Sequence, residues 1–391
     1  MITVLNKNKT SQQGNSAYNL NQLNSYLARK NFINSISAVT NPVHSLTNFN
    51  TFMNLIYTNN LQDNLSLWFS AEYTKRSGSI VSNLQNIDEI YFYSKDKNYS
   101  GQYLAYPTLM SNKAKFDSTD SSIRFTTTES LYYHLDIDKS LPLGNSNKTI
   151  IIVMSPLNSS YEYDTTENNW FFNYGLDWTN SLEPSSEGLC FTYDNLLSNG
   201  KKFSYTIGGN NNVLLAKNSS IDTKGMVSIF YNNQNKLLSK TFQSSVNEIV
   251  PYVEVVSGSP KSVFTLPVTL SEILSIEIYV SGIELTSSNY TIVGSTLTVN
   301  TPLSVGETLS AYAIVSTGLI DINHPINIKS GNGFFLNSHV INNSINLTTS
   351  AFHKMKNWKL YEFMIFDTEL GSNSTKFINI YNYLNTKYSL S

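Results

Sequence analysis

The chain has 391 residues, of which 40% are hydrophobic, 14% charged and 13% aromatic. This length exceeds one ordinary domain of roughly 100 to 200 residues, and the apolar content excludes a chain that is disordered throughout. A net charge of −2, from 26 basic and 28 acidic residues, provides no field that would gather phosphate groups, so we expect no nucleic-acid partner. Asn and Ser, about a quarter of the chain, replace charge as the polar surface.

Cys190 is the only cysteine, which excludes an intramolecular disulfide framework and a cysteine-based zinc site. We expect it to be a small buried residue. Residues Met1 to Asn15 contain no apolar core of a signal peptide, and the longest apolar runs, such as Ile150 to Met154, are too short to cross a bilayer. The sequence therefore predicts neither a secretory signal nor membrane insertion.

Two short amphipathic helices are predicted within residues 1–62, one on each side of the Asn41-Pro42 step. Their apolar positions recur at helical spacing. These are Leu20, Leu23 and Leu27 in the first helix, and Leu46, Phe49, Met53 and Ile56 in the second. Each stripe is narrow, so such a helix needs a surface to pack on. That surface is either the main domain or another subunit, and we interpret this segment as an anchor or an oligomerisation element.

Short β-type runs separated by Asn, Ser, Gly and Asp clusters make up the next part of the chain. They are Leu65 to Tyr73, Ile123 to Thr127, Thr149 to Pro156, Gly188 to Tyr193, Lys202 to Ile207 and Met226 to Tyr231. Many short strands with polar turns are typical of a sandwich. No helix of a dozen residues lies between them, which argues against βαβ units. The predicted fold class is mainly β, with an antiparallel sandwich as its body.

Composition changes between Ile249 and Gly318, where Asn falls to two residues and five Glu accompany the single Lys261. Strands in this stretch alternate cleanly, and Gly294-Ser295 is predicted as a two-residue hairpin turn. About seventy residues suffice for a small antiparallel domain. The predicted domains are a helical segment at 1–62, a sandwich formed by 63–247 and 319–391, and an inserted β-domain at 248–318.

A helix is predicted at the C-terminus. The side chains of Gly371-Ser372-Asn373-Ser374 are typical of a helix start. One apolar stripe follows, formed by Phe377, Ile380, Tyr381, Leu384 and Tyr388. We expect this helix to lie on the edge of the sandwich.

The closing residues resemble a known fold family. Lys359 to Leu370, of sequence KLYEFMIFDTEL, and the helix ending NYLNTKY at 382–388 resemble the last strand and helix of concanavalin A-like, laminin G-type jelly-roll domains. Leu67 to Ala71 resembles the first strand of that fold, and Phe116-Asp117 with Ile123 to Phe125 resembles its early Asp-then-strand signature. The resemblance implies a concanavalin A-like jelly roll that is interrupted once.

The interruption resembles the small β-domains of phage tail, fibre and collar proteins. The similar features are Ile278 to Gly282, Asn289-Tyr290-Thr291 and Leu303 to Glu307, although Ser281 stands where Asn is more usual. Together with the Asn-rich body, the chain resembles a tailed-phage virion protein of the crAss-like group. This resemblance implies a head fibre or capsid decoration protein, located in the virion after assembly in the host cytoplasm.

Catalytic patterns are weak in this sequence. The five histidines lie far apart and form no His-Glu-x-x-His pair. His134-Leu135-Asp136-Ile137-Asp138 would place two carboxylates on one strand face for calcium, but a solvated strand edge is the favoured interpretation. Glycoside hydrolysis needs two carboxylates across a cleft, which related glucanases place on one strand of alternating acidic residues. No Glu-x-Asp-x-Glu run is present, and Tyr161-Glu162-Tyr163-Asp164 offers one Glu and one Asp at the right alternation but no third acid. We therefore predict no catalytic residue, no metal site, no cofactor and no enzyme activity.

Residues 168–180 carry the strongest signal for carbohydrate binding, because aromatic rings stack on sugars and amide or carboxylate groups bind their hydroxyls. Alternation divides the aromatic run into two faces. One face holds Trp170, Phe172 and Tyr174, and the other holds Phe171 and Asn173. Several of these aromatic residues must therefore belong to the core.

Trp178, flanked by Asp177 and Asn180, is the candidate exposed platform for a sugar. For any one large aromatic residue a core position is the more common outcome. Trp68 and Trp358, on the first and last strands of the sandwich, are interpreted as core residues with no chemical role.

Three functional hypotheses follow. The leading one is a non-enzymatic virion protein that binds other virion proteins through its N-terminal segment, forms homo-oligomers and adheres weakly to host-surface glycans through many copies. The second is a bacterial glycan-binding or glycan-cleaving protein, which predicts an export signal and paired acids; a tail fibre or adhesin is an alternative role within a virion. The third is a purely architectural decoration protein, since a lectin-like fold does not dictate function.

Overall fold

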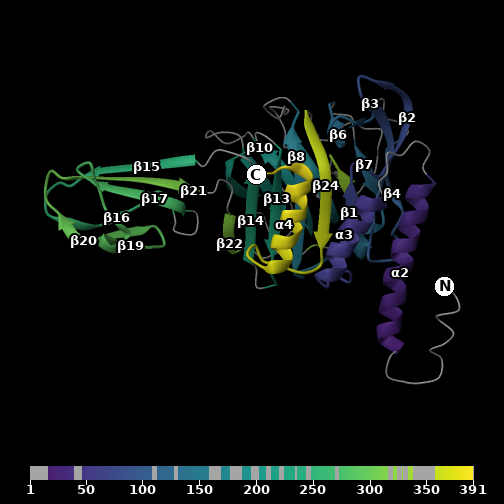
Figure 1. Cartoon of the computed structure of the whole chain (residues 1–391), viewed down its shortest axis with the longest axis horizontal. Helices are drawn as coiled ribbons and strands as arrows, with labels where there is room; N and C mark the ends of the chain where they lie inside the picture. The colour runs from purple at the N-terminus through teal and green to yellow at the C-terminus, as the bar shows by residue number, and fades with distance from the viewer. Residues whose placement is uncertain are drawn as a thin grey trace.

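A computed structural model forms the basis of the description. The described residues are 16–38, 46–107, 112–126, 131–157, 169–176, 187–194, 202–207, 213–219, 224–233, 236–243, 248–268, 273–315, 320–323, 328, 333–337 and 357–390. They form two antiparallel sheets, a layer of helices and a small second β-body that projects from one end (Figure 1). The predicted mainly β fold with a sandwich and short helices is confirmed.

Six strands form what we call the central sheet. In spatial order they are β1 (Leu65–Ser70), β24 (Trp358–Phe366), β8 (Lys148–Pro156), β13 (Gly225–Tyr231), β14 (Lys236–Gln243) and β22 (Ile320–Asn323). Each neighbouring pair is antiparallel. The first and last strands of the sandwich, far apart in sequence, therefore lie side by side at one edge of this sheet.

Nine strands form the second sheet, which we call the outer sheet. In spatial order they are β2 (Thr74–Val81), β3 (Leu84–Tyr91), β4 (Tyr103–Ala105), β7 (Tyr132–His134), β23 (Phe334–Leu336), β9 (Asn169–Leu176), β10 (Glu187–Asp194), β11 (Lys202–Ile207) and β12 (Val213–Ser219). Two short strands connect the two sheets. β5 (Lys115–Asp117) pairs with β3 of the outer sheet and with β6 (Ser122–Phe125), and β6 pairs with β24 of the central sheet.

Four strands of the central sheet, β1, β24, β8 and β13, are buried on both faces. On β8, Ile150, Ile152 and Met154 enter the core between the two sheets, whereas Ile151 and Val153 enter a second core beneath the helices. All nine residues of β8 are buried. A strand covered on both faces needs apolar residues at every position, which explains the unbroken apolar run in the sequence.

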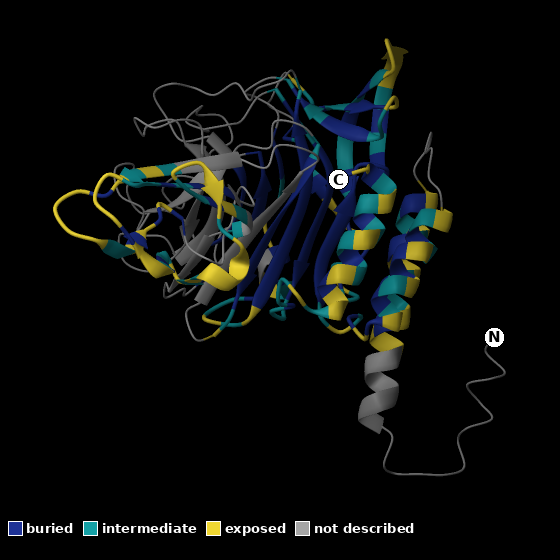
Figure 2. Ribbon diagram, turned by 60° about the vertical axis from the view of Figure 1, so that its left-hand side comes forward, coloured by how far each residue is buried: buried dark blue, intermediate teal, exposed yellow. Residues whose placement is uncertain are grey.

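Three helices cover the face of the central sheet that points away from the outer sheet (Figure 2). They are α2 (Ser16–Ser37), α3 (Leu46–Thr58) and α4 (Thr375–Tyr388). Rings from the first two surround Trp68, whose ring centroid lies 4.3 Å from that of Phe52 and 5.9 Å from that of Phe49. Of the four apolar positions predicted for α3, only Leu46 is exposed. The main domain is thus the surface on which these helices pack.

The predicted positions Leu23 and Leu27 are not on the packing face of the first helix, and the side chain of Leu20 lies outside the described residues. The buried residues of α2 lie one helical turn apart: Ser25, Ala28, Phe32 and Ile36. Leu23 lies on the opposite face and is 43% exposed. The rotation of the helix is set by its C-terminal half, where the Phe32 ring packs among aromatic residues.

Within the described residues, no helix combines the length and apolarity needed to cross a bilayer.

The C-terminal helix begins and ends with standard caps. The Ser374 hydroxyl accepts a hydrogen bond from the Phe377 amide at 3.2 Å, and Ser389 closes the helix in a left-handed conformation. The predicted positions are buried except Tyr381, which is half-buried. The expected place at the sandwich edge is wrong, because α4 lies across the central sheet, with Phe377 against Phe230 on β13.

A buried carboxylate joins the helix layer to the central sheet. Glu362 of β24, 1% exposed, accepts hydrogen bonds from the Trp68 indole nitrogen of β1 and the Tyr388 hydroxyl of α4, both at 2.7 Å. The Lys387 ammonium donates to the same carboxylate at 3.2 Å and lies 3.7 Å from Glu72. A buried charge is tolerated only when it is paired and hydrogen-bonded. These contacts satisfy both requirements for Glu362.

The described residues 248–315 form a separate β-body, which we call the module. Four strands make one sheet: β15 (Glu248–Val255), β21 (Thr308–Val315), β17 (Ile273–Val280) and β18 (Ile283–Glu284). Three more make the other: β16 (Lys261–Thr265), β20 (Thr296–Leu303) and β19 (Tyr290–Val293). Its own core lies between them. β19 and β20 join at Gly294-Ser295, where Gly294 has a φ of 61°, as the hairpin prediction requires.

Lys148 is buried at the start of β8 with 1% of its surface exposed. Its ammonium donates to the carbonyl oxygens of Ser146 at 2.7 Å and Gly144 at 3.3 Å, and lies 4.9 Å from the Tyr231 ring centroid. Among the described residues no carboxylate pairs with it. Burial therefore lowers the pKa of Lys148 to about 7.

Replacing Glu362 by Gln tests the buried carboxylate. We expect the free energy of unfolding to fall by about 3 kcal/mol, because Lys387 loses its hydrogen-bonded anionic partner and keeps only Glu72 at 3.7 Å, and the donors Trp68 and Tyr388 lose a charged acceptor. Urea denaturation followed by tryptophan fluorescence measures this change. The control is Glu369→Gln in a partly exposed turn, for which we expect a change within about 0.5 kcal/mol. Equal effects of the two substitutions would contradict the assigned role.

Lys148 predicts a specific pH dependence of stability. Its folded pKa lies below the unfolded value, so the unfolded chain binds more protons and stability rises with pH between the two values. Relative to Lys148→Met, the wild type should therefore gain about 3 kcal/mol of unfolding free energy between roughly pH 7 and pH 9.5. Chemical denaturation of both proteins at each pH measures the difference. A pH-independent difference would show that Lys148 is charged in the folded state.

Candidate functional site

The face of the outer sheet that points away from the core is the candidate binding surface. Strand register places one residue of each of five strands in a row: Glu89, Ala105, Tyr133, Phe335 and Asn173. The β9 end of the row is covered, since Phe335 is 1% and Asn173 4% exposed. The β3–β4 end is open, so a ligand would approach the face there.

Two tyrosines form the open end of this face. Tyr91 on β3 and Tyr103 on β4 are directly opposite in register, with ring centroids 5.5 Å apart and planes inclined at 56°. Tyr103 is 41% exposed, and Tyr91 is half-buried beside it. We call this pair, with Glu89 and Lys75, the tyrosine shelf. An exposed ring beside a carboxylate is a combination that binds the apolar and hydroxyl groups of a sugar.

Hydrogen bonds hold the shelf in place. The Tyr91 hydroxyl donates to one oxygen of Glu89 at 2.7 Å, and the Lys75 ammonium donates to the other at 2.9 Å. Burial, followed by the bond to Glu89, raises the pKa of Tyr91, so this phenol stays a neutral donor. The hydrogen bond to Glu89 also raises the pKa of Lys75. The carboxylate keeps lone pairs that a ligand hydroxyl can use.

The carboxylates beside the shelf are all engaged. Asp88 accepts from the Ser77 hydroxyl at 2.8 Å and forms an ion pair with Lys113, while Glu89 pairs with Lys75. These ion pairs and hydrogen bonds fix the two carboxylates in place, as a surface that accepts hydrogen bonds from sugar hydroxyls requires.

The predicted sugar platform lies outside the described residues. Asp177, Trp178 and Asn180 follow directly after β9, whose described part reaches Leu176. Residues 161–164, the closest approach to an acidic pair in the sequence, also lie outside the description. The cysteine at 190 belongs to β10, but its side chain is not described.

Alternation along β9 holds except at one residue. Phe172 and Tyr174 share one face, which is buried in the core between the sheets, and Asn173 lies on the other face. Phe171 was expected beside Asn173 but is also in the core, where its ring centroid lies 4.9 Å from that of Trp358. The register with β10 shifts at this position, and a bulge turns the extra residue toward the other face. Trp68 and Trp358 are core residues, as interpreted.

The possible calcium run does not form a shared strand face. β7 ends at His134, and a single 3-10 turn follows at Ile137–Ser140. Asp136 is exposed and pairs with Lys139 in that turn. Across the described ranges, no three His, Cys, Asp or Glu side chains gather closely enough to hold a metal ion.

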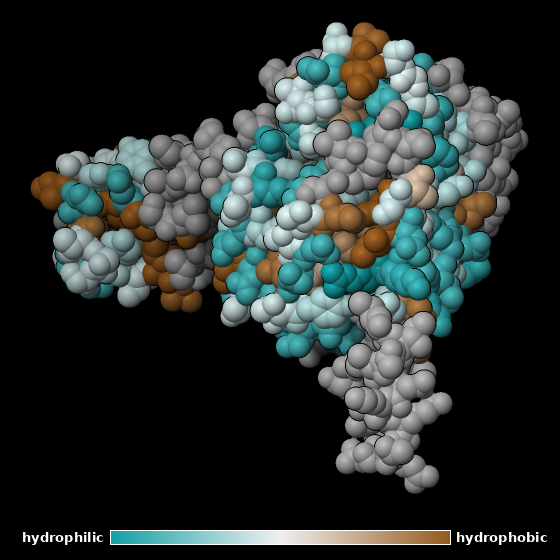
Figure 3. All heavy atoms as spheres, turned by 45° about the vertical axis from the view of Figure 1, so that its right-hand side comes forward, coloured by the Kyte–Doolittle hydropathy of each residue, from teal (hydrophilic) through white to brown (hydrophobic). Residues whose placement is uncertain are grey.

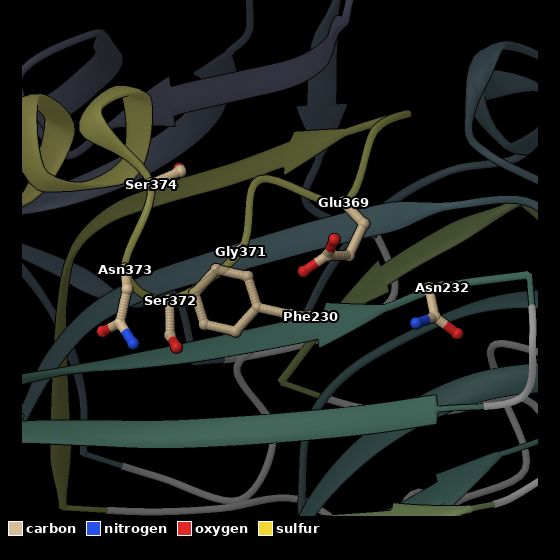
Figure 4. A pocket seen from close by; sticks show the side chains of 7 residues that line it. All are labelled: Phe230, Asn232, Glu369, Gly371, Ser372, Asn373 and Ser374. Carbon is tan, nitrogen blue, oxygen red and sulfur yellow. The ribbon is translucent and has the colours of Figure 1, made fainter.

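A hollow of about 340 Å³ lies where β13 meets the start of α4 (Figure 4) and is a second candidate site. The residues that line it are Phe230, Asn232, Glu369, Gly371, Ser372, Asn373 and Ser374. The N-terminus of α4 would attract an anion into this hollow, but the Glu369 carboxylate would repel it. The Ser374 hydroxyl already accepts a hydrogen bond from the Phe377 amide at this end of the helix. The Phe230 ring is 1% exposed, so it offers no face for stacking. The tyrosine shelf is therefore the stronger candidate.

The sequence prediction missed Tyr91 and Tyr103. The available signal was the density of tyrosines in residues 91–106, which holds YFYSKDKNYSGQYLAY. The segment holds five tyrosines and one phenylalanine. Which of these six rings are buried is decided only when β3 and β4 pair, because Leu104 then turns inward between Tyr103 and Ala105. A local aromatic cluster does not by itself reveal which rings remain exposed.

Comparisons with known proteins assign no family. No family model and no curated protein matches the sequence. Among solved structures, the fold is similar to Trypanosoma rangeli sialidase, with 8% identity, a TM-score of 0.33, and coverage of 93% of this chain and 38% of the sialidase. The complexes of that sialidase with sialic acid (9%, 0.32, 86% and 39%) and with the inhibitor DANA (8%, 0.31, 81% and 32%) are similar to the same degree. The chain spans little more than a third of the sialidase length, and likeness this low carries no argument about activity.

Proposed function

We propose that the protein is a non-enzymatic structural component of a tailed-phage virion, of the head-fibre or capsid-decoration type. The observation that carries this proposal is the separation of its parts: α2 lies at one end of the long axis and the module at the other (Figure 1). Such a two-ended molecule suits attachment at one end and display at the other. The sequence resemblance to phage fibre modules supports the same function.

The tyrosine shelf supplies weak adhesion to host-surface glycans in this proposal. Tyr103 presents an exposed ring, and Glu89 presents a carboxylate fixed by Tyr91 and Lys75. One stacked sugar gives a weak contact. Repetition of that contact over many copies on a particle converts weak binding into strong attachment. The ion pairs of Asp88 and Glu89 hold both carboxylates in place for ligand hydroxyls.

Glycan adhesion predicts distinct effects of two substitutions at one position. Tyr103→Ala removes the stacking surface and should weaken binding about tenfold, equivalent to ~1.4 kcal/mol. Tyr103→Phe keeps the ring face and should retain most of the affinity. A glycan array of bacterial surface polysaccharides identifies the ligand, and biolayer interferometry measures the affinity. Ile378→Ala, at a 43% exposed position on α4, is the control.

Absence of glycan binding by the full chain would exclude adhesion and favour a purely architectural protein. Equal losses for Tyr103→Ala and Tyr103→Phe would show that the ring face does not carry the contact. Release of reducing sugar from a bound polysaccharide would contradict the non-enzymatic assignment.

The virion assignment predicts where two peptide tags become accessible. A tag after Gly294, in the exposed β19–β20 turn of the module with no atom within 4 Å of a Cβ placed there, should bind gold-labelled antibody on purified phage particles. A tag before Met1 should be shielded by attachment. Electron microscopy measures the labelling of both. Particles that lack the chain by mass spectrometry, or that label more strongly at the N-terminal tag, would overturn the assignment.

A further inference from the structure

Charge is divided unevenly between the two ends of the molecule. Residues 1–62 contain four basic residues, Lys7, Lys9, Arg29 and Lys30, and no acidic residue, for a formal charge of +4. Residues 248–315 contain six glutamates and the single Lys261, for a formal charge of −5. The whole chain carries only −2. Arg29 and Lys30 belong to α2, which lies at the opposite end of the long axis from the module, so a basic helix and an acidic β-body stand at the two ends.

The basic end also carries exposed apolar surface. On the solvent face of α2, Leu23 is 43% exposed, Leu27 is half-buried and Lys30 is exposed. We call these three residues the arm patch. The helix packs on its own sheet through the opposite face. Leu23, which the sequence marked as part of a packing stripe, is therefore available for contact with another molecule.

The acidic end carries a matching surface on the sheet of β15, β21 and β17. Tyr312 lies between the buried Ala311 and Ala313, so it points away from the module core and is 38% exposed. Val253 and Val255 alternate with the partly buried Tyr252 and are 59% and 58% exposed. Figure 3 shows hydrophobic residues on the surface of the module.

Carboxylates stand among these apolar groups. Glu277 is exposed and directly opposite Tyr312 in register, and Glu284 is exposed and opposite Tyr279. The Tyr279 hydroxyl donates to Glu277 at 3.0 Å. We call Val253, Val255, Tyr312, Glu277 and Glu284 the module patch. The module patch combines apolar side chains with negative charge, so it complements the apolar side chains and positive charge of the arm patch.

We infer that the arm patch of one copy binds the module patch of a second copy. Charge decides between the possible pairings. Two arms bring together segments of +4, and two modules bring together segments of −5, so like charges oppose both. Pairing an arm with a module joins opposite charges and covers the leucines of one copy with the valines of the other.

This contact joins different surfaces of the two copies. The patches lie at opposite ends of one molecule, so they meet only between molecules. A contact of this head-to-tail kind either closes into a ring or propagates into a filament. Each patch is small against a stable interface of roughly 1,600 Å², so a single contact is weak. The electrostatic part falls with salt, because the Debye length shrinks to about 3 Å at 1 M.

The inference names the partner of the N-terminal segment and rests on the proposed virion role only for its biological purpose. Self-association is measurable in solution without particles or glycans. A chain that fails to self-associate can still be found on particles, and a chain that self-associates can be absent from them. The two proposals therefore fail separately.

Sedimentation velocity of the full chain over a concentration series tests the contact. We expect the weight-average mass to rise with concentration at about 0.05 M NaCl and to fall back toward the monomer at about 1 M. Lys30→Glu and Glu277→Lys should each weaken association at least tenfold. Their equimolar mixture should restore it, because every arm then meets a module of opposite charge at these positions. Lys376→Glu, on the exposed side of α4, is the matched charge control.

The apolar part has a matched pair of its own. Leu23 on α2 and Ile378 on α4 are each 43% exposed. Leu23→Asn should weaken association at least tenfold, whereas Ile378→Asn should leave it unchanged, and circular dichroism confirms that both variants fold. Three results would each overturn the inference: a monomer at every concentration in low salt, association that is insensitive to salt and to both charge reversals, or no rescue in the mixture.

Discussion

The pairing of Glu362 with three donors is the interaction on which the three-layer arrangement depends. Its carboxylate lies on β24 of the central sheet and binds Trp68 from β1 and Tyr388 and Lys387 from α4. The helices are thereby held by directional bonds as well as by apolar contact. The strands β1, β24, β8 and β13 are covered on both faces. Among the described residues, exposed aromatic and apolar side chains therefore stand on the outer sheet, the solvent face of the helices and the module.

Strands with continuous apolar runs, and a helix that begins with a capping side chain, could be predicted from the sequence. β8 and β24 are buried on both faces, so their apolar runs were unambiguous, and Ser374 marked the start of α4 through its side chain. The β2–β3 hairpin was not predicted. Its strand Thr74–Val81 mixes Lys, Arg, Ser and Gly, and Ser82 and Asn83 close the turn with positive φ, a conformation less common in Ser than in Gly.

Positions that depend on tertiary packing were less accessible to prediction. The rotation of α2 follows from the fit of Phe32 against distant rings, so Leu23 and Leu27 were assigned to the wrong side. Phe171 turned inward because a bulge changes the face of the strand there. Tyr91 and Tyr103 become a shelf only when β3 and β4 pair in one register. In each case a contact between segments distant in sequence overrides the local pattern.

The low charge of the chain gives its few charges unusual weight. With 14% charged residues, a local excess is not cancelled by a dense mixture of both signs, as it is on an ordinary surface. The N-terminal segment and the module therefore keep nearly their full charges of +4 and −5. Asn and Ser maintain solubility without adding charge, so copies do not repel each other strongly as whole molecules. The N-terminal segment of one copy can therefore attract the module of another, while the sandwiches between them stay nearly neutral.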